Sequence, residues 1–379
     1  MMLFMTDGTI IAENLLANKF LKRSFTTSVT KFQLSQSKFK TTFHILYSRN
    51  IILENLLWDL NMEVKRIAVI GECMVEIQTQ QLGRGFGGDT MNTAIYVSRV
   101  GAMHDAYDTV VSASYFTAFG QNAISQEIID QCGAQGVDMS HVLRLADKNV
   151  GLYLIETDPD GERRFSYWRD NSAARFWLDH QDDEALFATL SQFDMIYLSG
   201  ITLGIQSAAN VERLLAVLSR LRAIGKQICF DSNYRPALWH SPQETQSIYN
   251  AMYALTDLAL LTHEDEALLF GDVSAQATAE RVAALGVKEV VVKCGAEACH
   301  IHTHGQVSMV APTPVHGVID TTAAGDAFNA GYLAYRLKGC EAAEAARAGH
   351  RLAGTVITHR GAIIPMSAMP EALLETHSY

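Results

Sequence analysis

One pattern constrains the fold of this 379-residue chain more than any other feature. From about residue 62 onward, short apolar runs alternate with segments of helical period, such as 124–132 and 207–224, the second of which Gly225 ends. The apolar runs are Ile67–Ile70, Met195–Leu198, Ile228–Phe230, Leu258–Leu261 and Val290–Val292. Buried parallel strands with helices on both faces produce this rhythm. We therefore predict a doubly wound α/β fold with a mainly parallel sheet.

The alternation of apolar runs and helical segments is interrupted between residues 150 and 176. Leu152–Glu156 and Arg164–Arg169 are strand candidates that carry Tyr and Phe, and the Asp-Pro-Asp-Gly sequence at 158–161 is typical of a hairpin turn. Together with residues 74–86, this hairpin predicts a small β lid. We expect the lid to cover the carboxyl ends of the sheet strands, where open α/β folds bind ligands.

The first 61 residues differ in composition from the rest of the chain. Between Glu13 and Glu54 there are seven basic residues and no acidic one. We predict that residues 62–379 form the folded domain and that residues 1–61 are an extension outside it. The hypothesis we favour is sequence upstream of a true start at Met62. The alternative is a targeting segment, since a basic and acid-poor composition is typical of one.

Charge, hydrophobic content and cysteine spacing limit the classes of partner and the location that we expect for this protein. The chain has 41 Asp+Glu against 30 Lys+Arg, a formal charge of -11, which disfavours binding to a nucleic-acid backbone. Its 48% hydrophobic content allows a large core, yet no run approaches the roughly 18 apolar residues of a membrane helix. The six cysteines form no C-x-x-C pair. We expect a soluble cytoplasmic protein with small-molecule partners.

The segment 319–331 carries the strongest chemical signal. The small residues Ala323, Ala324 and Gly325 lead into a helical pattern, so they and Asp326 should form the first turn of a helix. The free N–H groups and the dipole of such a turn attract phosphate or developing negative charge. Asp326 could there accept a proton from an attacking hydroxyl. On the local pattern alone, an ordinary acidic residue in a first helical turn is an equally good interpretation.

A glycine cluster precedes another helical pattern. Gly83, Gly85 and Gly88 satisfy the dinucleotide motif G-x-G-x-x-G, but residues 72–82 separate the motif from the strand that it should follow directly. A second interpretation is a backbone cradle for a substrate, with Asp89 as a partner for hydroxyl groups. The third is a plain turn between the lid and a helix.

Two of these motifs resemble those of a known family. The segment 320–326 with its helix resembles the C-terminal signature of ribokinase-like (PfkB-type) carbohydrate kinases, and 87–92 is similar to their N-terminal glycine motif. Further segments resemble the branch of this family that acts on 2-dehydro-3-deoxygluconate: 70–74, 84–90, 167–169, 233–236 and 360–365. The resemblance runs from about Met62 to the C-terminus. It implies transfer of the γ-phosphoryl group of ATP, with Mg²⁺, to the terminal hydroxyl of that sugar acid.

The resemblance also implies roles for individual residues. Asp326 would be the base, and the N–H groups of Ala323, Ala324 and Gly325 would form the anion hole. The substrate would be held by Gly88, Asp89, Thr90, Met91, Asn92, Tyr153, Tyr167, Trp168, Arg169 and Arg235. The nucleotide would be held by Asn233, Lys293, Gly295, Ala296, Glu297 and Asn329. The family's N-x-x-E element reads Thr262-His-Glu-Asp265 here, so Glu264 and Asp265 are the metal candidates.

The choice of substrate class depends on two arginines. A keto sugar acid carries a carboxylate, and Arg169 and Arg235 are the side chains that could bind it with paired hydrogen bonds. A kinase of the same type for a neutral sugar or nucleoside, and a catalytically silent sugar-binding protein of the same fold, are the alternatives. Relatives also pair lid to lid as homo-oligomers, and a monovalent cation is a further cofactor candidate. The sequence does not decide these two points.

Overall fold

The structure is a computed structural model that describes residues 2–6, 9–13, 63–78, 83–103, 107, 109–157 and 163–374. The chain divides into two compact units, Met1–Leu56 and Leu57–Tyr379. In the first unit, β1 (Met2–Thr6) pairs antiparallel with β2 (Thr9–Glu13). The predicted turn at 158–161 lies outside the described residues. All that follows concerns the second unit.

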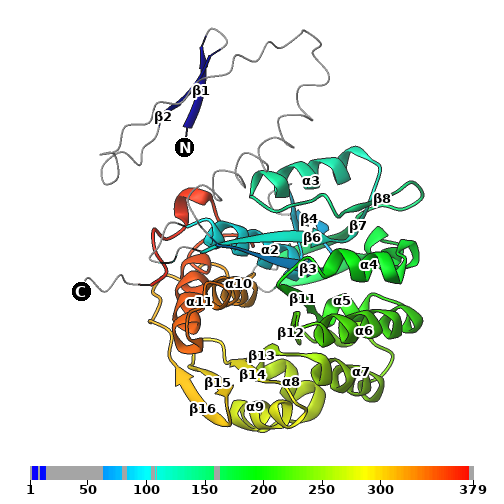
Figure 1. Ribbon diagram of the computed structural model, residues 1–379, viewed down its shortest axis with the longest axis vertical. Helices are drawn as coiled ribbons and strands as arrows, with labels where there is room; N and C mark the ends of the chain where they lie inside the picture. Colours follow the sequence, from blue (N-terminus) through cyan, green and yellow to red (C-terminus); the bar gives the residue numbers. More distant parts are fainter. Residues whose placement is uncertain are drawn as a thin grey trace. The chain divides into compact units, whose positions relative to one another are not determined.

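An eight-stranded sheet forms the centre of this unit (Figure 1). Its strand order is β16-β15-β14-β13-β12-β11-β3-β6; the pairs from β14 to β6 are parallel, and β15 and β16 add an antiparallel edge. The strands are β3 (Glu63–Ile70), β6 (Thr109–Phe116), β11 (Met195–Ser199), β12 (Gln227–Asp231), β13 (Leu258–Thr262), β14 (Glu289–Lys293), β15 (Cys299–Thr303) and β16 (Gln306–Val310). Every strand predicted from an apolar run is present, and the prediction of a mainly parallel sheet is confirmed.

Alternate side chains of these strands enter two separate hydrophobic cores, as on β11, where Tyr197 faces one core and Leu198 the other. The first core lies under α2 (Asp89–Gly101), α3 (Ala123–Ala134), α10 (Ala324–Leu337) and α11 (Ala342–Val356). The second lies under α4 (Asp183–Leu190), α5 (Gly200–Gly204), α6 (Ala208–Ala223), α7 (Pro242–Leu255), α8 (His263–Phe270) and α9 (Ala275–Ala284). Helices thus cover both faces of the sheet (Figure 1), which confirms the doubly wound fold.

Local chemistry sets the ends of these helices. The side chain of Ser207 accepts a hydrogen bond from the N–H of Asn210 and so begins α6, and Gly225, at φ 86°, follows its end. Short elements complete the unit: β7 (Ala118–Gly120), β8 (Leu143–Leu145) and the 3₁₀ turns Ala173–Phe176, Leu178–His180, Pro236–Leu238 and Met366–Ala368.

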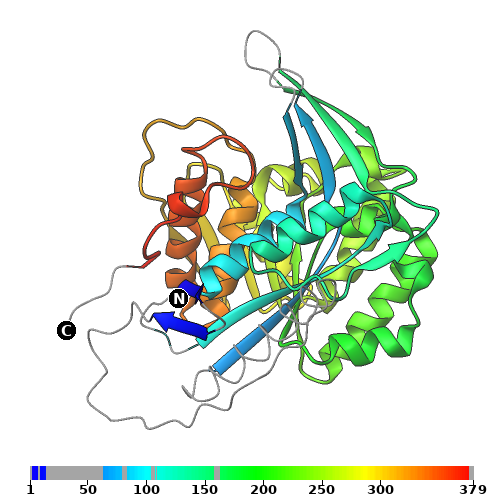
Figure 2. The same cartoon turned by 90° about the horizontal axis from the view of Figure 1, so that it is seen from above.

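A four-stranded lid of order β10-β9-β4-β5 stands off the main sheet, as the blue and green strands at the top of Figure 2 show. Its strands are β4 (Met74–Gln78), β5 (Gly83–Gly87), β9 (Gly151–Thr157) and β10 (Arg163–Trp168). The register pairs Glu76 with Tyr153, and Tyr153 with Tyr167, so these three residues share one face of the lid. The predicted lid is confirmed in both of its segments.

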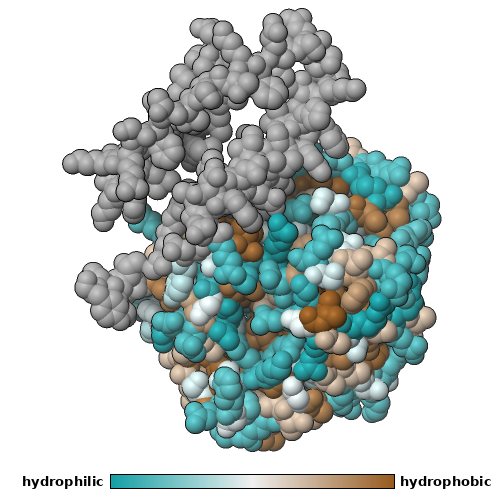
Figure 3. Space-filling model, viewed as in Figure 1, coloured by the Kyte–Doolittle hydropathy of each residue, from teal (hydrophilic) through white to brown (hydrophobic). Residues whose placement is uncertain are grey.

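In the part of the surface that Figure 3 draws in colour, hydrophilic and apolar residues are interspersed. Among the helices of the described residues, none has the length and apolar content needed to cross a membrane.

Candidate active site

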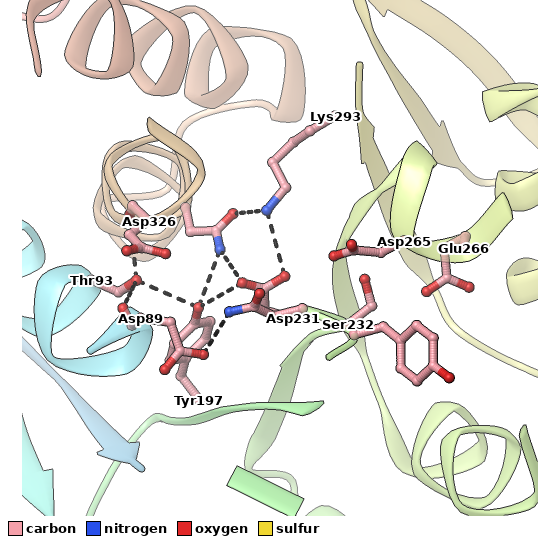
Figure 4. A network of polar contacts seen from close by, with 12 residues as sticks. Asp89, Thr93, Tyr197, Asp231, Ser232, Asp265, Glu266, Lys293 and Asp326 are labelled. Carbon is pink, nitrogen blue, oxygen red and sulfur yellow. Dashed lines mark hydrogen bonds and ion pairs between the residues drawn. The ribbon is translucent and has the colours of Figure 1, made fainter. Parts of the chain in front are cut away.

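The site lies where the amino ends of α2 and α10 meet the carboxyl ends of β12 and β14 (Figure 4). From α2, Asn92 donates a hydrogen bond through Nδ2 to Oδ2 of Asp326 on α10, at 2.8 Å. From the loop after β12, Asn233 donates through Nδ2 to Oδ2 of Asp89, also at 2.8 Å. The structure therefore brings together four residues that the sequence predicted for the site.

The surroundings of Asp326 raise the pKa of its carboxylate. Withdrawal from solvent and the neighbouring carboxylate of Asp89 raise the pKa of Asp326 to about 7, although the hydrogen bond from Asn92 acts in the opposite direction. A carboxylate with a pKa near the working pH is well suited to accept a proton from a hydroxyl.

The turn before Asp326 leaves room for an anion. Ala323 has φ 60°, in the left-handed region, and ends the loop directly before α10. A Cβ atom added to Gly325 would lie 3.8 Å from Nζ of Lys293. A cation therefore lies close to the positive end of the helix dipole. The N–H of Ala324 donates to the carbonyl oxygen of Thr321 at 3.2 Å, so this predicted anion-hole donor already has a partner.

A buried polar network lies behind this turn (Figure 4). Nζ of Lys293 donates to Oδ1 of Asn329 at 2.8 Å, and the amide of Asn329 donates to Oδ2 of Asp231 at 2.9 Å. Nζ of Lys293 also lies 3.5 Å from Oδ1 of Asp231. Burial raises the pKa of Asp231, and the charge of Lys293 opposes this rise. Sequence reasoning placed Lys293 and Asn329 at the site but missed Asp231.

A sequence signal for Asp231 did exist. This residue directly follows the apolar run Ile228–Phe230, at the carboxyl end of a parallel strand. Acidic residues at that position face the ligand-binding edge of an open α/β sheet.

The residues predicted for the nucleotide do not all lie together. Asn233 has φ 29° and bonds to Asp89, which was predicted for the substrate. Gly295, Ala296 and Glu297 form the exposed turn that follows β14. Their position at the carboxyl end of that strand is compatible with a ligand at the sheet edge.

The glycine motif at 87–92 has some residues at the site and others in the core. A Cβ on Gly88 would collide with the main-chain oxygen of Glu72, so the chain needs glycine here. Asp89 follows and reaches the site, but Thr90 and Met91 are fully buried. The hydroxyl of Thr90 lies 2.9 Å from that of Tyr115, and Met91 belongs to the first core. The side chains of Thr90 and Met91 thus serve packing and not, as predicted, substrate contact.

The dinucleotide interpretation of the same motif is wrong. Residues 83–87 form β5, a strand of the lid, and not a loop that connects a strand of the main sheet to a helix.

The lid approaches the site through Tyr153. A Cβ added at Gly87 would lie 3.0 Å from the hydroxyl of Tyr153 and 3.7 Å from Oδ1 of Asn92, so the tyrosine lies beside the residue that holds Asp326. This hydroxyl donates to Oε2 of Glu76 at 2.5 Å. Burial, followed by the charge of Glu76, raises the pKa of Tyr153 well above its usual range. Glu76 is a second residue that sequence reasoning missed.

The side chains of Tyr167 and Trp168 point to opposite faces of the lid. The ring of Tyr167 lies 6.1 Å from that of Tyr153, on the same face, and is 52% exposed. Trp168 is the next residue of β10 and therefore faces the opposite side of the lid, where it is 60% exposed. The structure does not bring Trp168 together with the other predicted substrate residues.

Both predicted arginines already have an acidic partner. Arg169 is buried and forms an ion pair with the equally buried Glu72. Arg235 is about half exposed, its Nη1 lies 3.6 Å from Oδ1 of Asp265, and it donates to the carbonyl oxygen of Tyr234 at 2.9 Å. The ion pair between Arg169 and Glu72 is short and buried. The ion pair between Arg235 and Asp265 is longer and accessible to water.

The predicted metal ligands do not form a cluster. In the described part of the chain, no group of three or more His, Cys, Asp or Glu could hold a metal ion. Glu264 is exposed, and Asp265 is the partner of Arg235. Glu266 is buried, where it accepts hydrogen bonds from Tyr253 and Arg281, both at 2.6 Å.

Comparison with known proteins agrees with this geometry. The sequence profile described as pfkB family carbohydrate kinase matches residues 54–369. The chain belongs to this family. This kinase is 48% identical over 314 residues to a 2-dehydro-3-deoxygluconokinase of Dickeya dadantii (strain 3937), a match that covers 82% of this chain and all of the relative. It is 46% identical over 311 residues to a protein of the same name in Escherichia coli (strain K12), covering 81% of this chain and 99% of the relative.

Solved structures show the same fold. A fructokinase with bound ATP from Xylella fastidiosa matches the kinase with a TM-score of 0.66 at 23% identity, covering 80% of this chain and 95% of the other. The family resemblance predicted from the sequence is thus confirmed, and the protein is an ATP-dependent carbohydrate kinase.

Proposed function

We propose that this kinase transfers the γ-phosphoryl group of ATP to the terminal hydroxyl of 2-dehydro-3-deoxygluconate, which gives 2-dehydro-3-deoxy-6-phosphogluconate. Identity of nearly one half to two proteins named for this reaction, along their whole length, supports the substrate. The observation that carries the chemistry is the Asp326 carboxylate at the amino end of α10, held by Asn92.

In this proposal, Asp326 accepts the proton of the attacking hydroxyl while that oxygen forms its bond to phosphorus. The hydrogen bond from Asn92 fixes the direction of the carboxylate, and Asp89, held by Asn233, binds a substrate hydroxyl beside it. Catalysis of phosphoryl transfer depends mainly on in-line positioning of the reacting groups and on neutralisation of their charge. Tyr153 and Tyr167 close over the sugar from the lid.

The nucleotide phosphates lie, in this proposal, at the first turn of α10. The main-chain N–H of Gly325 and the ammonium of Lys293 face the transferred group, and Asn329 keeps Lys293 in place. Bound Mg²⁺ neutralises phosphate charge during transfer. It usually takes only one or two protein carboxylates, since phosphates and waters complete its shell. The residues present fit this need without a three-ligand cluster, and Asp265 is our candidate.

The direct test is ADP release with ATP and Mg²⁺ over five acceptors: 2-dehydro-3-deoxygluconate, its galacto epimer, fructose, ribose and adenosine. We expect strong turnover confined to the keto acids. Turnover on a neutral acceptor alone would keep the kinase chemistry but reject the sugar acid.

One observation favours a second candidate, a kinase for a neutral sugar. Arg169 and Arg235 are both paired with acidic side chains, so neither is a free cation. Arg235→Leu separates the two candidates. If Arg235 binds the carboxylate, this change raises KM for the keto acid by about tenfold or more, because a hydrogen bond between charged groups is lost. It leaves KM for a poor neutral acceptor unchanged. Equal effects on both acceptors would remove Arg235 as the partner of the carboxylate.

Three further parts of the proposal concern the cellular location, the oligomeric state and a second cation. A cytoplasmic location is compatible with six free cysteines. A homo-oligomer through the lid is compatible with the exposed Trp168 on the outer lid face, which a second lid could cover. A monovalent cation rests on the family resemblance alone, and potassium titration of the activity tests it.

A further inference from the structure

Glu72 makes a set of contacts that none of the roles above uses. It lies between β3 and β4, where the chain leaves the main sheet for the lid, and it is only 2% exposed. Its carboxylate pairs with Nη2 of Arg169 and accepts a hydrogen bond from the hydroxyl of Ser172 at 2.5 Å. Its main-chain oxygen lies against Gly88, at the start of α2. One residue thus touches the segment that follows the last lid strand and the residue that precedes the helix carrying Asn92.

The buried guanidinium of Arg169 has one donor that is not satisfied within the described residues. It is 8% exposed, and its Nε has no hydrogen-bond partner among the described residues. A guanidinium presents five donors in a rigid plane, so fixing Nη2 also fixes the direction of the others. A buried donor without an acceptor is unfavourable, which means that an incoming carboxylate oxygen would satisfy a need already present.

We propose that Glu72 is a positioning residue for substrate recognition. It orients Arg169 so that the remaining guanidinium donors receive the carboxylate of the sugar acid. Because its main chain also packs against Gly88, Glu72 sets the separation between this carboxylate and the hydroxyl that faces Asp326. This inference rests on the proposed function, since it assumes that the substrate is an acid.

The test is Glu72→Gln, which keeps the shape of the side chain and removes its charge. We expect KM for 2-dehydro-3-deoxygluconate to rise about tenfold or more, from the loss of a charge-assisted hydrogen bond on Arg169. We expect kcat at saturation and KM for ATP to stay within about threefold. The matched control is Glu127→Gln, which removes the ion pair to Arg84 on the lid, 2.6 Å long, and should leave both KM values unchanged.

A double-mutant cycle separates positioning from a merely structural role. If Glu72 acts through Arg169, then Glu72→Gln adds nothing to the KM of Arg169→Met. Arg169→Met alone leaves a buried, unpaired carboxylate and could unfold, whereas the double variant carries neither charge. Melting curves establish which variants are folded. If Arg169→Met does not fold, the KM of the double variant should be at least that of Glu72→Gln; a lower value would overturn the role.

The outcomes are distinguishable. A wild-type enzyme that phosphorylates the keto acid, with an unchanged KM in folded Glu72→Gln, would overturn the role of Glu72 and leave the proposed function standing. A wild-type enzyme without turnover on keto acids would overturn both. If Glu72→Gln does not fold, Glu72→Asp replaces it, since this change retracts the carboxylate by one methylene and should raise the same KM.

Discussion

At the scale of single residues, the proposed mechanism depends on the Asp326 carboxylate, whose pKa its neighbours set. Burial and the charges of Asp89 and Asp231 raise the pKa of Asp326, while Asn92 and Lys293 lower it. The balance leaves the pKa at about 7, so a modest change in any neighbour shifts the fraction of the enzyme in which Asp326 is ionised, which is the active form in our proposal.

Asp326→Asn should therefore abolish turnover without abolishing binding. Removal of a general base typically costs about 10²-fold to 10⁴-fold in kcat. The amide still fits beside Asn92, so calorimetry should find sugar affinity within a few-fold of wild type. Asp147→Asn is the control, since the side chain of Asp147 is 75% exposed on the surface. Turnover near the wild-type level in Asp326→Asn would exclude Asp326 as the base.

The pH profile gives a second prediction. Because the base must be ionised, kcat should fall as the pH drops below about 7, the pKa of Asp326. Asn92→Ala removes a hydrogen bond that favours the ionised form, so the inflection should move to higher pH. Rates measured from pH 5.5 to 9 test this shift, with the exposed Asn171→Ala as the control. An inflection that stays in place or moves to lower pH would contradict the assignment.

Sequence reasoning found Asp326 from the chemistry of its own segment, but it missed Glu72 and Glu76, whose partners lie far away along the chain. Asp326 is recognisable from the small residues that precede it in the chain. Glu72 and Glu76 gain their partners only through the lid, because the register of β4 against β9 brings Glu76 to Tyr153. No spacing within the sequence encodes that register.

At the scale of elements, apolar runs predicted the buried parallel strands well because both faces of these strands enter a core. Three strands of the sheet were not predicted: β6 and β16 at its two edges, and β15 next to β16. β16 is mostly exposed and β15 carries two histidines, so neither reads as a buried apolar run. The first turn of α2 differs from the prediction in the opposite way. The glycine motif at 87–92 predicts a substrate site, but the side chains of Thr90 and Met91 lie in the core.

The left-handed residue before α10 yields a prediction at this scale. Ala323 has φ 60°, a conformation that costs a residue with a Cβ about 1 kcal/mol and that glycine adopts freely. Ala323→Gly should keep activity and equal or raise the melting temperature. Ala323→Val should lower both, because a β-branched side chain is poorly tolerated there. A valine variant as stable and active as wild type would contradict this account of the turn.

At the scale of the whole molecule, we propose that the kinase unit is complete from Met62 onward. The strand β3 begins at Glu63 and lies between β11 and β6 in the sheet. Removal of residues 2–61 should leave kcat and the melting temperature close to those of the full chain. Removal of residues 2–70 deletes β3 from the middle of the sheet and should abolish folding, so this second truncation is the control. A chain lacking residues 2–61 that is folded but inactive would show that the extension contributes to the site. One that does not fold would place the true domain boundary earlier in the chain.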